Sequence, residues 1–254
     1  MATKLITALD FPDVEGAMAL VDRIGEAGEW YKVGKQLFTA CGPRVVEQLK
    51  QRGKKVFLDL KYHDIPNTVA QAVASAARIG ADMCNVHALG GPAMLSAAAE
   101  AAEKARILLT AVTVLTSMDA GELAAVGIER SPEEQVLRLA RLAQSNGVAG
   151  VVCSSLELDA IRNACGREFV TVVPGIRPAD SSADDQKRIM TPRQAAQRGA
   201  DFIVVGRPIT KAADPAAAGI NGDLPDLTIG FAAERTVIGE NRSDPMRPWI
   251  DQRQ

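Results

Sequence analysis

The stretch Val56-Phe57-Leu58-Asp59-Leu60-Lys61-Tyr62-His63-Asp64 runs from an apolar strand directly into a cluster of charges. Side chains along a strand alternate between its two faces, so Phe57, Asp59 and Lys61 are predicted to share one face. Two opposite charges on a covered strand are expected at a cavity mouth, because burying them without partners would cost several kcal/mol each. Pro66 then opens a helical pattern, which places the charges at a strand-to-helix turn. A solvated turn is the competing interpretation, and these residues alone do not decide.

The rest of the chain alternates apolar segments of strand length with alanine-rich segments of helical period, which indicates repeated β-α units. The helix starts at Ser131-Pro132-Glu133-Glu134 and Thr191-Pro192 carry capping signals. An α/β fold, a (β/α)8 TIM barrel, is therefore predicted. An open doubly wound sheet is disfavoured, because Leu9-Asp10-Phe11-Pro12 rather than G-x-G-x-x-G follows the first strand. The eight predicted strands are Leu5–Leu9, Tyr31–Gly34, Val56–Lys61, Met83–His87, Ile107–Leu115, Gly150–Ser154, Val170–Pro174 and Phe202–Gly206.

Composition narrows the class of partner. The 254 residues, 47% of them hydrophobic, suit one well-cored single domain. A formal net charge of −2 without blocks of like charge favours a small-molecule partner over nucleic acid or a membrane surface. No apolar stretch is long enough for a signal peptide or a membrane span, so a cytoplasmic protein is expected. Cys41, Cys84, Cys153 and Cys165 form no CxxC pair, which argues against a zinc site and fits reduced thiols.

Barrel enzymes build their sites on the loops that follow the strands, so the predicted strand ends are the place to search. Gly206 and Arg207 follow the eighth strand, where barrels often hold phosphate groups with backbone amides and a guanidinium fork. Taken singly, Asp10 is better explained as a turn residue and Lys32 as a solvated lysine, whereas the position of Arg207 favours a phosphate contact over a surface ion pair. Their joint occurrence is what favours a site. The polar or glycine-rich strand ends are Asp10, Lys32, Asp59 with Lys61, Thr116, Pro174-Gly175-Ile176-Arg177-Pro178 and Gly206-Arg207-Pro208.

The segment Asp59-Leu60-Lys61-Tyr62-His63-Asp64-Ile65-Pro66-Asn67-Thr68 also fits the D-x-K-x-x-D signature and the I-P-N-T continuation of the orotidine 5′-phosphate decarboxylase family. The chain resembles this family over about residues 1–218. The resemblance implies a (β/α)8 barrel that forms a homodimer without a cofactor or metal, and it leaves 219–254 as an extension of unknown structure. The other matching segments, in the family's order, are Tyr31-Lys32-Val33-Gly34, Leu115-Thr116-Ser117-Met118, Pro174-Gly175-Ile176-Arg177-Pro178 and Gly206-Arg207-Pro208.

The same resemblance implies a role for each site residue. Asp59 and Lys61 are expected to be catalytic, with Lys32 completing an alternating charge network. Asp64 is expected to act across the dimer interface, in the partner's site. The implied reaction converts orotidine 5′-monophosphate to uridine 5′-monophosphate and CO2 in pyrimidine nucleotide synthesis. The residues expected to bind substrate are Asp10, Lys32, Thr68, Thr116, Arg177, Gln186, Gly206 and Arg207.

The physical chemistry of this reaction fits the charged stretch. Loss of CO2 from C6 leaves an sp2 carbanion that the ring delocalises poorly, so the spontaneous reaction is very slow. The enzyme must therefore lower the activation free energy by an amount near the upper end of the usual range, about 23 kcal/mol. A fixed ammonium at the developing charge is the natural device, because preorganised electrostatics in a dry site are usually the largest contribution. Lys61 fits this role, since carboxylates on both sides are expected to keep it charged until it protonates C6.

Two other kinds of barrel enzyme remain as alternatives. A metal-dependent sugar-phosphate decarboxylase or lyase shares the D-x-K-x-x-D pattern, but it needs a carboxylate for Mg2+ at the position where this chain has Lys32. A Schiff-base aldolase would use Lys61 as a neutral nucleophile, which neighbouring carboxylates oppose. A barrel that only binds nucleotides would be distinguished by its lack of turnover.

Overall fold

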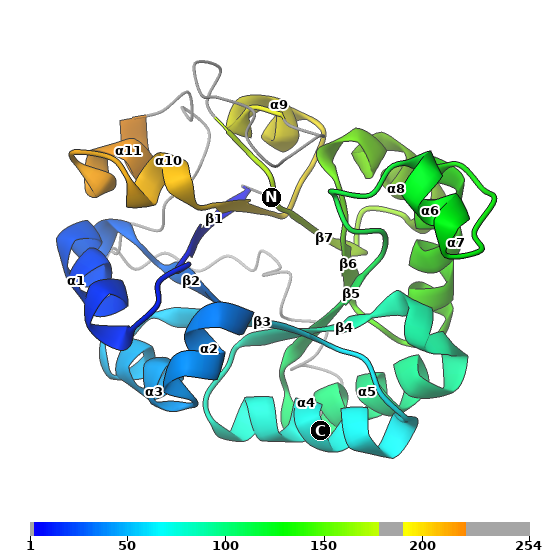
Figure 1. The fold of residues 1–254 in the computed structure, drawn as a ribbon, viewed down its shortest axis with the longest axis horizontal. Helices are drawn as coiled ribbons and strands as arrows, with labels where there is room; N and C mark the ends of the chain where they lie inside the picture. Colours follow the sequence, from blue (N-terminus) through cyan, green and yellow to red (C-terminus); the bar gives the residue numbers. More distant parts are fainter. Residues whose placement is uncertain (1–2, 178–189, 222–254) are drawn as a thin grey trace, which may run out of the picture.

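The computed structural model describes residues 3–177 and 190–221, which form a closed barrel of eight parallel strands in chain order (Figure 1). β1 pairs with both β2 and β8, so the sheet has no free edge. The predicted TIM barrel is therefore confirmed. The strands are β1 (Lys4–Ala8), β2 (Trp30–Gly34), β3 (Lys55–Tyr62), β4 (Met83–His87), β5 (Leu108–Val112), β6 (Gly150–Val152), β7 (Val170–Val173) and β8 (Phe202–Val205).

The helices surround the barrel, as Figure 1 shows. The capping boxes at Ser131 and Thr191 are both formed, with proline in the first turn of each helix, as predicted. Pro66 likewise begins a helix directly after the charged stretch. The helices are α1 (Val14–Ile24), α2 (Lys35–Cys41), α3 (Arg44–Gln51), α4 (Pro66–Arg78), α5 (Gly91–Ala105), α6 (Ala120–Ala125), α7 (Pro132–Ser145), α8 (Leu158–Cys165), α9 (Pro192–Gln197), α10 (Arg207–Thr210) and α11 (Pro215–Asn221).

The core has two parts, which the two faces of the strands separate. On β3, Phe57 belongs to the cluster inside the barrel, whereas Leu58 packs in the larger cluster between barrel and helices. This alternation is the one that the pleat predicts. Trp30 and Phe202 meet edge to face in the inner cluster, with ring centroids 5.3 Å apart. The inner cluster thus fills the barrel interior.

Residues beyond the predicted barrel domain are described only in part. α11 continues the chain past residue 218 and lies beside α1 (Figure 1). The rest of the predicted extension, 222–254, lies outside the described residues. No helix in the described part of the chain combines the length and apolar character needed to cross a bilayer.

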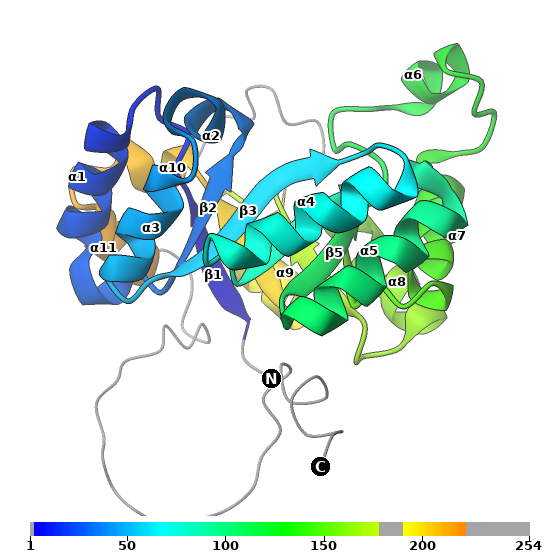
Figure 2. The same cartoon turned by 90° about the horizontal axis from the view of Figure 1, so that it is seen from below.

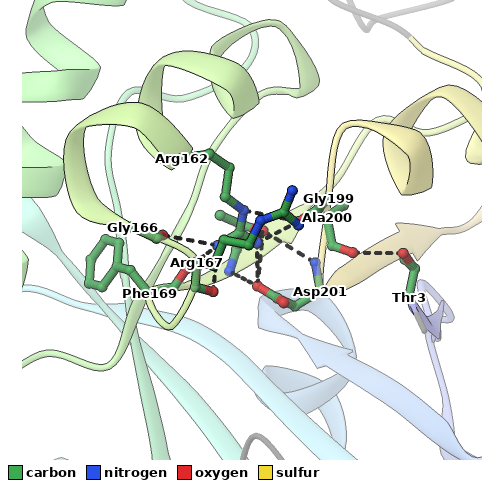
Figure 3. A network of polar contacts seen from close by, with 9 residues as sticks. Thr3, Arg162, Gly166, Arg167, Phe169, Gly199, Ala200 and Asp201 are labelled. Atoms are coloured by element: carbon green, nitrogen blue, oxygen red, sulfur yellow. Dashed lines mark hydrogen bonds and ion pairs between the residues drawn. The ribbon is translucent and has the colours of Figure 1, made fainter. Parts of the chain in front are cut away.

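The two Gly-Ala-Asp segments that precede β4 and β8, residues 80–82 and 199–201, each bind neighbouring elements together. Asp201 accepts a hydrogen bond from Arg162 of α8 at 2.6 Å and another from the Thr171 N–H of β7 at 2.7 Å (Figure 3). Asp82 makes the equivalent contacts with Lys50 of α3 at 2.7 Å and the Val56 N–H of β3 at 2.8 Å. Each aspartate therefore fixes a helix to the start of a strand.

Replacing Asp201 by asparagine should lower the free energy of unfolding by about 3 kcal/mol, because it removes one partner of a mostly buried ion pair. The Arg162 and Asp201 side chains are only 11% and 16% exposed. Urea denaturation would measure the loss. The matched control is Asp159→Asn, whose ion pair with Arg198 is 3.4 Å long and well exposed, and it should cost less than about 1 kcal/mol. Equal losses in the two variants would contradict this account of the Arg162–Asp201 contact.

Candidate active site

A cavity of about 550 Å3 opens at the carboxyl ends of the strands, where barrel enzymes carry their sites. Figure 2 shows α6 projecting beyond this end of the barrel. Apolar residues of the inner cluster, among them Phe57, Val152 and Val204, form part of the cavity wall. The cavity brings together these residues predicted from the strand ends: Asp10, Lys32, Asp59, Lys61, Thr116, Arg177, Gly206 and Arg207.

Four of these side chains form a row of alternating charge across the ends of β1, β2 and β3. Lys32 Nζ lies 3.0 Å from Asp10 Oδ1 and 3.7 Å from Asp59 Oδ2. Lys61 Nζ lies 2.6 Å from Asp59 Oδ1. Each ammonium therefore has a carboxylate beside it, which offsets part of the cost of withdrawing these charges from water.

Asp59 is the most constrained member of the row. Burial opposes ionisation of this carboxyl, but Lys32 and Lys61, together with hydrogen bonds from Lys61 and Asn85, outweigh the burial and hold its pKa below the ordinary value. Asp59 is therefore ionised throughout the neutral range. A fixed anion between two ammonium groups keeps both cations in place at the cavity mouth.

The backbone at Lys61 departs from a regular strand. Lys61 has φ +53°, in the left-handed region that few residues other than glycine adopt, and the β3–β4 register shifts between Leu58 and Tyr62. Asp59 and Lys61 do both line the cavity, so the prediction that they share a face is confirmed. The pleat alone does not explain it, because the strand is bulged where the charges lie.

Asn85 of β4 is a residue of the site that sequence reasoning missed. Its side chain donates to Asp59 Oδ1 at 2.8 Å and accepts from the Lys61 N–H at 2.8 Å. It is completely buried. The available signal was a lone amide within the apolar strand Met83–His87, since a buried polar side chain normally has partners.

Glycine makes room for the row at the end of β2. A Cβ added to Gly34 would lie 2.9 Å from Lys32 Nζ. Any larger residue would therefore push the ammonium away from Asp10 and Asp59. This contact gives the Tyr31-Lys32-Val33-Gly34 segment a physical reason for its glycine.

The far side of the cavity is cationic. Arg177 and Arg207 both line it, from the segments that follow β7 and β8. The Arg177 N–H donates to the Met190 carbonyl at 3.1 Å, and Ile176 pairs with Met190 in an isolated bridge. Gly206 and Arg207 begin α10, next to β1 across the barrel seam. Gln186, the remaining predicted residue of this region, lies outside the described residues.

Two predicted residues, Asp64 and Thr68, do not line this cavity. The Asp64 carboxylate accepts from the Ile65 N–H at 2.6 Å, and Thr68 is exposed on the first turn of α4. Asp64 instead borders a separate, open depression that also includes Ile65 and Leu89. Ile65 is 67% exposed and Leu89 48% exposed, which is unusual for large apolar side chains so close together.

His63 and His87 stack on each other with ring centroids 5.4 Å apart. Burial, and then the neighbouring His63, Lys61 and Lys35, lower the pKa of His87 to about 4. His87 is therefore uncharged at neutral pH. Neither ring borders the cavity that holds the charged row.

Comparison with known proteins gives a consistent result. Residues 3–220 match the family model described as orotidine 5′-phosphate decarboxylase / HUMPS family. The chain is 53% identical over 226 residues to the orotidine 5′-phosphate decarboxylase of Nitrosospira multiformis, covering 88% of this chain and 95% of that protein. It is 55% identical over 218 residues to the enzyme of the same name from Chromohalobacter salexigens, covering 85% of this chain and 92% of that protein.

A solved structure extends the match to three dimensions. The orotidine 5′-phosphate decarboxylase of Lactobacillus acidophilus superposes with a TM-score of 0.77 at 39% sequence identity, covering 85% of this chain and 96% of that one. Sequence and structure agree over nearly the whole described barrel. This chain therefore belongs to the orotidine 5′-phosphate decarboxylase / HUMPS family.

Proposed function

We propose that this protein is an orotidine 5′-phosphate decarboxylase, which converts orotidine 5′-monophosphate to uridine 5′-monophosphate and CO2 in pyrimidine nucleotide synthesis. The observation that carries the proposal is the Lys61 ammonium, held 2.6 Å from the ionised Asp59 at the mouth of a cavity with cationic residues on its far side. The reaction needs a cation at C6 and an anchor for a phosphate, and both kinds of group line this one cavity.

In this mechanism the bond between C6 and the carboxylate breaks, CO2 leaves, and the electron pair stays on C6. The Lys61 ammonium stabilises this carbanion because Asp59 already holds it in position before the reaction begins. A proton then moves from Lys61 Nζ to C6, and the neutral amine regains a proton from water. Asp59 holds the ammonium in place, and Lys32 orients Asp59 from the other side.

The phosphate of the substrate would lie at the cationic side of the cavity. Arg177 and Arg207 line this side, and a guanidinium donates two parallel hydrogen bonds to phosphate oxygens. We assign Gly206 to the same group, and Asp10 and Thr116 to the remaining contacts with the nucleotide. Contacts with the phosphate, far from C6, then serve to fix the ring against Lys61.

Arg207→Ala should raise KM for orotidine 5′-monophosphate by at least about tenfold, because it removes a charge-assisted contact with the phosphate. Added guanidinium ion should restore part of the lost rate, since it can occupy the place of the missing side chain beside the substrate phosphate. Steady-state assays with and without guanidinium would measure both effects. Arg44→Ala, at an exposed position on α3, is the control and should behave as wild type. A defect that guanidinium does not relieve would argue against a phosphate contact.

We further propose that the enzyme is a cytoplasmic homodimer without a cofactor or metal, in which Asp64 and Thr68 complete the site of the partner. The exposed Ile65 and Leu89 beside Asp64 support an interface there, because such apolar side chains are commonly covered by a partner. A reducing compartment suits the cysteines, none of which forms a disulfide in the described chain.

The alternative, a metal-dependent sugar-phosphate decarboxylase or lyase, is not favoured. Lys32 stands between Asp10 and Asp59, within 3.0 and 3.7 Å of their carboxylate oxygens, and an ammonium there repels a divalent cation.

An assay with purified protein tests the proposed activity. Orotidine 5′-monophosphate should be consumed in the presence of a chelator, as followed by the change in pyrimidine absorbance, and added Mg2+ should not increase the rate. Turnover of a keto-sugar phosphate only with Mg2+ would support the alternative instead.

A further inference from the structure

Asn85 is a buried amide whose two polar groups both contact catalytic residues. Its side chain is 0% exposed, between Cys84 and Val86 on β4. Nδ2 donates to Asp59 Oδ1 at 2.8 Å, and Oδ1 accepts from the backbone N–H of Lys61 at 2.8 Å. An amide buried without partners would cost a few kcal/mol, so these two contacts account for its presence in an apolar strand.

The contact with Lys61 replaces a missing bond of the sheet. Leu58 pairs with Cys84 and Tyr62 with Val86, so β3 advances four residues while β4 advances two. Asn85 is therefore the one β4 residue opposite the bulged segment 59–61. Lys61 has φ +53° there, a conformation that is strained for a residue other than glycine. Asn85 accepts a hydrogen bond from the Lys61 N–H and thereby stabilises the backbone conformation that directs the ammonium toward the cavity.

The contact with Asp59 sets the rotation of its carboxylate. Asp59 Oδ1 accepts hydrogen bonds from Asn85 Nδ2 at 2.8 Å and from Lys61 Nζ at 2.6 Å. Asp59 Oδ2 lies 3.7 Å from Lys32 Nζ. One side chain thus controls both halves of the Asp59–Lys61 pair, the carboxylate through its donor and the lysine through its acceptor.

We propose that Asn85 is a positioning residue for the decarboxylation, acting through Asp59 and Lys61 without touching the substrate. This inference rests on the proposed function. A neutral amide is required because it must donate to a carboxylate and accept from an N–H at the same time. Leucine supplies neither group, and an ionised aspartate supplies only the acceptor.

Asn85→Leu, which keeps the number of side-chain heavy atoms but removes both polar groups, tests the role against a matched control. Thr110→Val is the control, because Thr110 pairs with Asn85 across β4 and β5, is equally buried, and has a side-chain hydroxyl with no hydrogen-bond partner among the described residues. Asn85→Leu should lower kcat about a hundredfold, the usual effect of a small misplacement of reacting groups, with KM changed by less than about threefold. Thr110→Val should keep kcat within about twofold. Equal kcat values in the two variants would overturn the proposal.

Asn85→Asp provides a second test that does not depend on the stability of the leucine variant. When ionised, the new carboxyl repels Asp59; when protonated, it donates to Asp59 and still accepts from the Lys61 N–H, as the amide does. The ratio of its kcat to that of wild type should therefore be highest at low pH and fall at least about tenfold as the pH rises through the pKa of the coupled pair. A ratio independent of pH would overturn the proposal. Failure of the proposed function would appear differently, as wild-type protein that does not consume orotidine 5′-monophosphate.

Discussion

Lys61→Ala should lower the turnover of orotidine 5′-monophosphate by more than about 10^4-fold, because it removes both the charge that stabilises the carbanion and the proton that quenches it. Affinity for the nucleotide should change by less than about tenfold, since an ammonium that acts mainly in the transition state contributes little to the ground state. Single-turnover assays and equilibrium titration with uridine 5′-monophosphate would measure the two quantities separately.

The matched control for Lys61 lies at the other end of the same strand. Lys55 begins β3, pairs with Glu29 at 3.3 Å and covers the Trp30 ring, away from the cavity. Lys55→Ala should therefore turn over substrate at nearly the wild-type rate. Turnover by Lys61→Ala close to that of the control would remove Lys61 from the mechanism.

The second large effect concerns Asp64. Neither Lys61→Ala nor Asp64→Ala should be active alone, but mixing the two proteins should restore activity if Asp64 serves the partner's site. A mixed dimer then has one site with both defects and one intact site. With random subunit exchange half of the dimers are mixed, so recovery should approach roughly a quarter of the wild-type rate.

If Asp64 acted within its own chain, every site in the mixture would keep one defect. Subunit exchange must therefore be verified, for example with two tags of different size. No recovery after complete exchange would contradict the shared site while leaving the decarboxylase proposal intact. Asp13→Ala cannot replace Asp64→Ala in this mixture. Asp13 caps α1, so dimers of that variant should be active by themselves and would give activity without any sharing of sites.

The barrel could be predicted because its pattern repeats. Alternating apolar strands and capped helices leave few other topologies, and the eight predicted strands all exist. The predicted fifth strand, Ile107–Leu115, ended too late, since β5 stops at Val112. Val114 and Leu115 line the cavity instead of continuing the ladder, and their apolar character made the segment resemble strand.

The site could be predicted only in so far as topology determines it. In a closed parallel barrel all strand ends meet at one rim, so Asp10, Lys32 and Arg207 had to be neighbours. The role of Asn85 depends on a bulge in β3, and no period in the sequence reveals a bulge. Asp64 follows the strand in a turn whose direction the pleat does not fix, and any partner that it serves is a second chain.

One reaction tests the central claim, that a C6 carbanion forms and takes its proton from an exchangeable donor in a site that needs no metal. Wild-type protein is incubated with orotidine 5′-monophosphate in D2O with a chelator, and the product is examined by proton NMR. The ammonium exchanges its protons with solvent, so uridine 5′-monophosphate should form with deuterium at C6 and no H6 signal. Absence of product, or product that retains protium at C6, would contradict the account.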